Sequence, residues 1–152
     1  HGCAQVLFLD AETGTNIDEL GGMNIFLVKS DGTLVTPELN GNILAGITRD
    51  SIITLAQARG IKVDERPVTV EEWRAGVADG SIVEAFACGT AAVVTPIGEL
   101  KSEDFTLTMP PVAQPLSMSL RQELTDIQYG RTPDVHGWLV RLDTEAGSDS
   151  GE

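Results

Sequence analysis

The sequence predicts a mixed α/β (α+β) domain, and three observations lead to that prediction. Short apolar runs rich in Val, Ile, Leu and Phe are bounded by turn residues, which is typical of buried strands. Segments with apolar residues at helical spacing, each followed by glycine, stand between these runs. The chain has 152 residues, of which 41% are hydrophobic and 22% charged, as expected for one soluble globular domain.

The first half of the chain is predicted to hold three strands and one helix. The strand-like runs are residues 4–9, 24–29 and 61–66. Asp31-Gly32 follows the second run, and Asp-Gly between apolar runs favours a hairpin. Residues 48–59 are predicted to form a helix, with Thr48 as the N-cap and Gly60 at the C′ position.

The second half is predicted to hold two helices and up to four strands. Thr69 and Glu72 make a capping box that opens a short helix ending before Gly80. Leucine and isoleucine at helical spacing predict a further helix over residues 116–129, stopped by Gly130. The predicted strands are residues 82–88, 92–97, 105–108 and 136–142, and residues 143–152 are predicted to be an acidic, disordered tail.

Composition excludes several classes of function. The net charge of −13 argues against nucleic acid or an anionic membrane as partner. No apolar run approaches the roughly 20 residues that span a bilayer. Cys3 and Cys88 form neither a disulfide framework nor a metal motif, so no metal is expected and reduced thiols favour the cytoplasm. The chain opens with His1 directly before a strand-like run, and we therefore expect it to be a piece of a longer polypeptide.

Two backbone features are candidates for anion binding. Gly46-Ile47-Thr48 enters a helix, where free N–H groups and the helix dipole can hold a phosphate; an ordinary N-cap explains the same residues. Gly89-Thr90-Ala91 interrupts two apolar runs and can present N–H groups to an anion; a bulge or tight bend is the alternative. Cys88 is interpreted as a packing residue, because a lone cysteine in an apolar run usually packs, and His136 as a structural residue, because no nucleophile stands beside it.

Four blocks of sequence point to a family. They are ELGGMN at residues 19–24, LAGITR at 44–49, FACGTAA at 86–92 and LTDIQYGR at 124–131. In this order they resemble the C-terminal domain of branched-chain amino acid aminotransferases, which use pyridoxal 5′-phosphate. The resemblance covers about residues 3–142 and implies the fold type IV architecture, a β pseudo-barrel with flanking helices. The last block favours these enzymes over D-amino acid aminotransferases and aminodeoxychorismate lyases.

The resemblance also implies roles for individual residues. Glu19 matches the acid that pairs with the pyridine nitrogen of the cofactor, and Leu44 matches a residue that packs on the ring. The positions that match phosphate-binding residues are Gly46, Ile47, Thr48 and Thr90. The positions that match the substrate-carboxylate turn are Gly89, Thr90 and Ala91, with Gly89 as the hinge of the turn. Ala45 departs from the pattern, since the family usually has proline there.

The catalytic lysine is not expected within this chain. The family's Schiff-base lysine lies upstream of the segment that matches His1, and none of Lys29, Lys62 and Lys101 stands in its motif. The family's small N-terminal domain, which completes the substrate pocket across a homodimer, lies upstream as well. The resemblance therefore implies that a longer parent protein transfers the amino group of Leu, Ile or Val to 2-oxoglutarate. The alternatives are another fold type IV enzyme, or a non-catalytic binding or assembly domain of the same fold.

Overall fold

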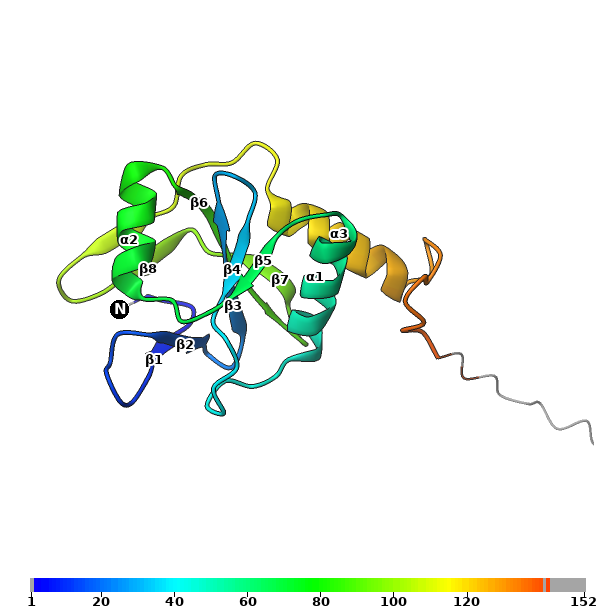
Figure 1. The fold of residues 1–152 in the computed structure, drawn as a ribbon, viewed down its shortest axis with the longest axis horizontal. Coiled ribbons are helices and arrows are strands. Elements are labelled where there is room, and N and C mark those ends of the chain that lie inside the picture. The colour runs from blue at the N-terminus through cyan, green and yellow to red at the C-terminus, as the bar shows by residue number, and fades with distance from the viewer. Residues whose placement is uncertain (1, 141, 143–152) are drawn as a thin grey trace, which may run out of the picture.

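A five-stranded sheet forms the centre of the molecule (Figure 1). The structure is a computed structural model, and it describes residues 2–140 and 142. The strand order is β5-β4-β3-β6-β7, in which only the β4–β5 pair is parallel. The strands are β3 (Asn24–Lys29), β4 (Leu34–Thr36), β5 (Val63–Glu65), β6 (Ile82–Gly89) and β7 (Val93–Pro96).

Two small antiparallel sheets accompany the central one. The first pairs β1 (Leu7–Leu9) with β2 (Ile17–Leu20), and the second pairs β8 (Glu99–Lys101) with β9 (Thr106–Thr108). The described residues also form three helices, α1 (Ile47–Ala58), α2 (Val70–Asp79) and α3 (Leu116–Gln128). The predicted mixed α/β class is confirmed, with the strands divided among three sheets.

Both faces of the central sheet are buried. Phe26 of β3 points to the face covered by α1 and α3, where its ring stacks on Phe86 at a centroid distance of 5.1 Å. Leu27, the next residue of β3, points to the opposite face, where it joins the core around Trp73 of α2. Because alternate residues serve two separate cores, the strand is an unbroken apolar run rather than an alternating one.

Several of the predicted strands differ from the observed ones. The first strand is shorter than residues 4–9, and neither β2 nor β8 was predicted. The predicted strand at 136–142 is wrong for the described residues 136–140 and 142, which belong to no strand. Gly137 has a φ of +69° there, a left-handed conformation that does not continue a strand. Residue 141 and the predicted tail at 143–152 lie outside the described residues.

The three helices begin in different ways. At α2 the predicted cap is confirmed, because Thr69 Oγ1 accepts a hydrogen bond from the Glu72 N–H at 3.0 Å. At α3 the N-cap is Pro115, and the buried carboxylate of Glu84 on β6 accepts the first two helical N–H groups. Helix α1 has Gly46 as its N-cap and no side-chain acceptor. Within the part of the chain that the structure describes, α1 is therefore the helix whose N-terminus is uncapped.

None of the helices in the described ranges has the length and apolar character that crossing a bilayer demands.

Candidate functional site

The N-terminus of α1 offers free backbone donors. Gly46 has an extended conformation (φ −68°, ψ 135°), and the first intrahelical bond runs from the Asp50 N–H to its carbonyl at 3.1 Å. Among the described residues, nothing accepts from the N–H groups of Ile47, Thr48 or Arg49. The prediction that Thr48 is the N-cap is wrong, because the helix begins one residue before it. This turn can hold an anion, since the helix dipole adds to the free donors.

Two large apolar side chains lie exposed beside these donors. Leu44 is 67% exposed and Ile47 is 87% exposed, whereas Ile43 between the sheet and this turn is buried. Exposed apolar side chains are common singly, but two that flank a set of free N–H groups provide an apolar surface next to an anion site. That combination fits a group with a phosphate and a flat aromatic ring.

The β6–β7 turn carries the second set of donors. The last cross-strand pair is Gly89 with Val93, and Thr90 and Ala91 lie exposed beyond it. Among the described residues, nothing accepts from the N–H groups of Thr90 and Ala91. The hinge role of Gly89 stays a prediction: Gly89 has no positive φ, and the left-handed residue at this turn is Val93, at φ +57°. A β-branched residue in that conformation is strained, by about 1–3 kcal/mol.

Residues Met23 and Asn24 bring the two donor sets together. Asn24 stands opposite Cys88 in the β3–β6 ladder, one residue before Gly89. Its side chain reaches the α1 approach, donating from Nδ2 to the Leu44 carbonyl at 2.9 Å. Met23 packs on Gly89, where an added Cβ would lie 3.0 Å from Met23 Cγ. Asn24 was not predicted to be a functional residue, although a polar residue that opens an apolar strand was a usable signal.

Glu19 lies on a separate element. It is a half-buried residue of β2, paired in register with Phe8 of β1. Its carboxylate makes no hydrogen bond or ion pair with any described residue, and is therefore available to a ligand. Strand β2 leads to Asn24 through the tight turn Gly21-Gly22, in which both residues have positive φ. The structure thus links Glu19 to the other candidate residues through the backbone, and not through a side-chain contact.

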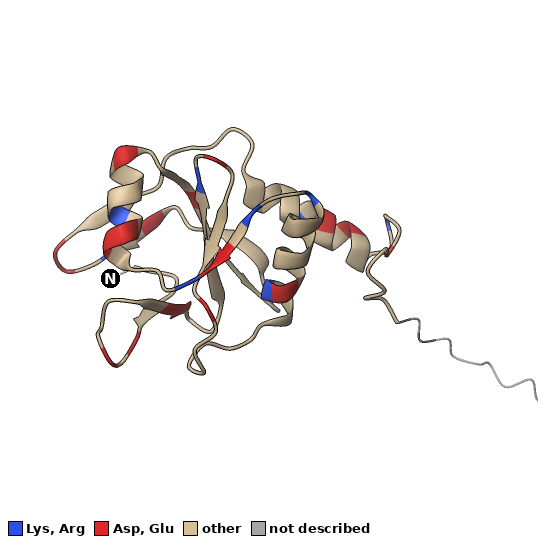
Figure 2. Cartoon of the chain, in the orientation of Figure 1, with Lys and Arg blue, Asp and Glu red and all other residues tan. Residues whose placement is uncertain are grey.

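One buried cation lies in the same helical turn as the α1 donors. Arg49, in the first turn of α1, donates to the Pro37 carbonyl at 3.1 Å and to Glu65 at 2.9 Å. Burial raises the pKa of the Cys88 thiol to about 12, an effect that Arg49 partly opposes. The thiol therefore stays protonated, which agrees with the predicted packing role. Acidic residues occur on all three helices rather than at one face (Figure 2).

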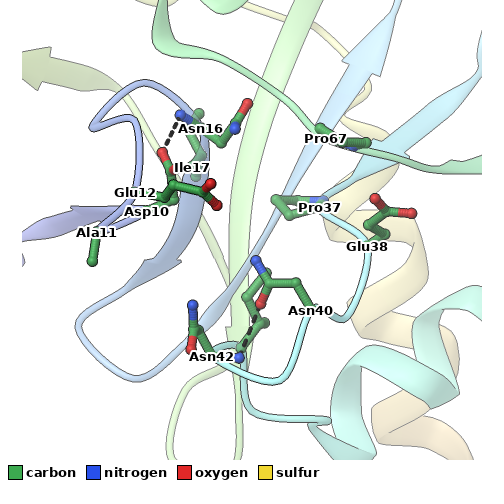
Figure 3. A pocket seen from close by; sticks show the side chains of 11 residues that line it. Asp10, Ala11, Glu12, Asn16, Ile17, Pro37, Glu38, Asn40, Asn42 and Pro67 are labelled. Atoms are coloured by element: carbon green, nitrogen blue, oxygen red, sulfur yellow. Dashed lines mark hydrogen bonds between the residues drawn. The ribbon is translucent and has the colours of Figure 1, made fainter.

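A separate hollow lies beside the loop before α1 (Figure 3). It has a volume of about 290 Å³ and none of the predicted site residues lines it. Asp10 at its edge accepts hydrogen bonds from Thr13 and from the Thr15 and Asn16 N–H groups. These bonds, with the Thr13 hydroxyl first, lower the pKa of Asp10 to about 2. The Asp10 carboxylate thus stabilises the loop between β1 and β2.

The chain belongs to the amino-transferase class IV family, whose sequence profile matches residues 1–100. It is 48% identical over 146 residues to the branched-chain-amino-acid aminotransferase of Mycolicibacterium smegmatis, and covers 39% of that protein with 93% of its own length. It is 47% identical over 149 residues to the enzyme of the same name from Mycobacterium tuberculosis CDC 1551 / Oshkosh, with 93% and 40% covered. The chain thus spans about two fifths of the length of these curated relatives.

Solved structures give the same match. The branched-chain amino acid aminotransferase from Escherichia coli superposes with a TM-score of 0.76 and 34% identity, over 94% of this chain and 44% of that one. The enzyme of the same name from Thermobaculum terrenum, in its PLP-bound holo form, superposes with a TM-score of 0.70 and 35% identity, over 86% and 39%. The resemblance and the fold predicted from the four sequence blocks are therefore confirmed.

Proposed function

We propose that this chain is the cofactor-binding part of a branched-chain amino acid aminotransferase, which transfers the amino group of Leu, Ile or Val to 2-oxoglutarate with pyridoxal 5′-phosphate. The observation that carries the proposal is the uncapped start of α1, within the LAGITR block. The described residues cap the other two helices with Thr69 and Glu84, so α1 alone keeps its first donors for a ligand. Relatives named as branched-chain enzymes support the substrate class, and the holo form of one solved relative supports the cofactor.

The phosphate cradle is assigned to Gly46, Ile47, Thr48 and Thr90. Backbone N–H groups at a helix start bind phosphate through hydrogen bonds and the positive end of the dipole. Leu44 covers one side of the ring with its exposed apolar side chain. The exposed turn at Thr90 and Ala91 receives the substrate carboxylate, with Gly89 giving room for Met23 behind it.

Glu19 is assigned as the partner of the pyridine nitrogen. The carboxylate has no competing partner in the described chain, and it would hold that nitrogen protonated. When bound, the cofactor supplies an electron sink for the negative charge formed at the substrate Cα. Glu19 acts on this chemistry by keeping the proton in place.

The remaining parts of the enzyme are assigned to sequence outside this chain. These parts are the lysine that anchors the cofactor and moves the proton at Cα, and the small domain that closes the pocket. The fraction of the relatives that the chain covers, 39% in one case and 40% in another, supports this assignment. We further propose that the whole protein is a cytoplasmic homodimer.

The first test removes the Glu19 carboxylate. In the polypeptide that includes the upstream sequence, Glu19→Ala is expected to lose most of the leucine-to-2-oxoglutarate activity while keeping its thermal unfolding midpoint. Glu12→Ala is the matched control, because Glu12 is an exposed carboxylate in the loop between β1 and β2. Near-normal turnover of Glu19→Ala would remove the assignment. D-alanine used as donor in place of leucine separates the other fold type IV activities, and a wild-type protein that binds no cofactor supports the non-catalytic alternative.

The second test deletes one donor of the cradle. Ile47 is the first residue of α1, a position where proline fits because its missing N–H has no intrahelical partner. Gly46 before it is extended, as proline requires of its predecessor. Ile47→Pro is expected to leave the fold intact and to weaken pyridoxal phosphate binding about tenfold, since one charge-assisted hydrogen bond is lost. Ile47→Ala, which keeps the N–H, is the control; equal affinities of the two variants would contradict the cradle.

A further inference from the structure

One side chain from the central sheet holds the segment that leads into α1. Asn24 is 6% exposed, and its backbone is fixed by pairing with Cys88 in the β3–β6 ladder. Its Nδ2 donates to the Leu44 carbonyl at 2.9 Å, and the same carbonyl accepts from the Gly46 N–H at 2.8 Å. Both bonds therefore converge on one oxygen, which closes the tight turn that leads into the helix.

The side-chain oxygen of Asn24 lies close to Gly46. A Cβ added to Gly46 would lie 2.3 Å from Asn24 Oδ1, closer than non-bonded atoms approach. The φ of Gly46 is −68°, which any residue adopts, so the need for glycine here comes from Asn24 and not from the backbone. Asn24 thus holds the turn with a hydrogen bond on one side and a close contact on the other.

We propose that Asn24 is a positioning residue, which sets the distance between the first turn of α1 and the β6–β7 turn and thereby determines how tightly phosphate is held. The inference rests on the proposed function, because it concerns the same phosphate cradle. One short segment contacts both donor sets: Asn24 contacts Leu44 and Gly46, while Met23 beside it contacts Gly89.

The body of α1 is held independently of Asn24. Ile52 and Leu55 are fully buried in the core, and Arg49 joins the helix to Glu65 of β5. Removing the Asn24 amide is therefore expected to leave the helix packed while its approach turn moves. A residue that serves stability alone would instead lower the unfolding midpoint and leave the preference for a phosphate group unchanged.

The experiment is a double-mutant cycle on the polypeptide that includes the upstream sequence. Its variants are Asn24→Ala, Gly46→Ala and the double variant. Each is titrated at equilibrium with pyridoxal 5′-phosphate and with pyridoxal, which lacks the phosphate, and its thermal unfolding is recorded without cofactor. Each single variant is expected to lose about tenfold in the ratio of the two affinities. The double variant is expected to be no weaker than Asn24→Ala, because the alanine at 46 no longer meets Oδ1.

Each other outcome overturns the inference in a distinguishable way. Single variants whose affinity ratios stay within about twofold of wild type show that Asn24 does not position the cradle. Losses that add in the double variant show that the two residues do not act through their contact. If Asn24→Ala does not fold, Gly46→Ala gives the same readout, since it keeps both polar atoms of Asn24. A wild-type protein that does not bind pyridoxal phosphate overturns the proposed function, and the inference with it.

Discussion

The start of α3 allows a stability change to be worked out in advance. Glu84 is 6% exposed and lies on β6, far from α3 in the sequence. Its Oε2 accepts from the Leu116 N–H at 2.9 Å, and its Oε1 accepts from the Ser117 N–H at 3.0 Å. Pro115 at the N-cap position provides no side-chain acceptor. The carboxylate of this sheet residue therefore acts as the N-terminal cap of α3.

Glu84→Ala is expected to lower the free energy of unfolding by about 3 kcal/mol. A hydrogen bond to a charged group contributes about 1.5–3 kcal/mol, and the two bonds share one carboxylate, so their full sum is not expected. The lost charge at the helix N-terminus adds about 0.3–1 kcal/mol. Glu84→Gln keeps one acceptor and turns an NH₂ group toward the second donor, so about half of the loss is expected.

Urea unfolding followed by far-UV circular dichroism measures both variants. With an m-value of about 1.5 kcal/mol/M, a loss of 3 kcal/mol lowers the midpoint by about 2 M. Glu103→Ala is the control, because Glu103 is exposed and has no hydrogen bond or ion pair in the described chain. Surface changes of that kind stay within about 0.5 kcal/mol. If Glu84→Ala falls in the same range as the control, the capping role is refuted.

Two further predictions follow from the pKa values of Cys88 and Asp10. Burial raises the pKa of Cys88 to about 12, so its thiol is expected to resist alkylation at pH 8 in the folded protein and to react in guanidinium. The exposed Cys3 is expected to react in both states, so the modified residue is identified by peptide mapping, and rapid modification of Cys88 in the folded protein would contradict the prediction. Hydrogen bonds, that of the Thr13 hydroxyl first, lower the pKa of Asp10 from 3.8 to about 2. A lowered carboxyl pKa stabilises the fold above pH 3.8, and that contribution is lost as the pH falls toward 2. Asp10→Asn should therefore flatten the acid side of the stability curve, and an unchanged pH dependence would exclude the effect.

The sequence predicted the elements whose pattern is local or doubly buried. Strand β3 was predicted with its observed bounds, because residues on both of its faces enter a core and the run stays apolar. The cap of α2 was predicted as well, since Thr69 and Glu72 interact over one helical turn.

The misplaced elements depend on distant residues. Strand β2, Ile17–Leu20, contains two acidic residues, and its pairing with β1 is not visible in its own sequence pattern. Propensity favours Thr48 over Gly46 as the cap of α1. The observed N-cap is Gly46, where Asn24, more than twenty residues earlier in the sequence, leaves no room for a side chain. The candidate donors were therefore predicted from their motifs, and the residue that places them was not.

In the candidate site, the groups proposed to bind the ligand differ from the residues proposed to hold those groups in place. The proposed phosphate and carboxylate donors are backbone N–H groups, which every residue except proline carries, so side-chain substitution at Ile47 or Ala91 keeps them. Their positions depend on Asn24 and on two glycines, whose added Cβ atoms would meet Asn24 and Met23. Glu19 is the reverse case, because its proposed role resides wholly in a side chain that no described residue holds. Loss of affinity for phosphate should therefore follow changes at Asn24, Gly46 and Gly89, whereas loss of turnover at unchanged affinity should follow changes at Glu19.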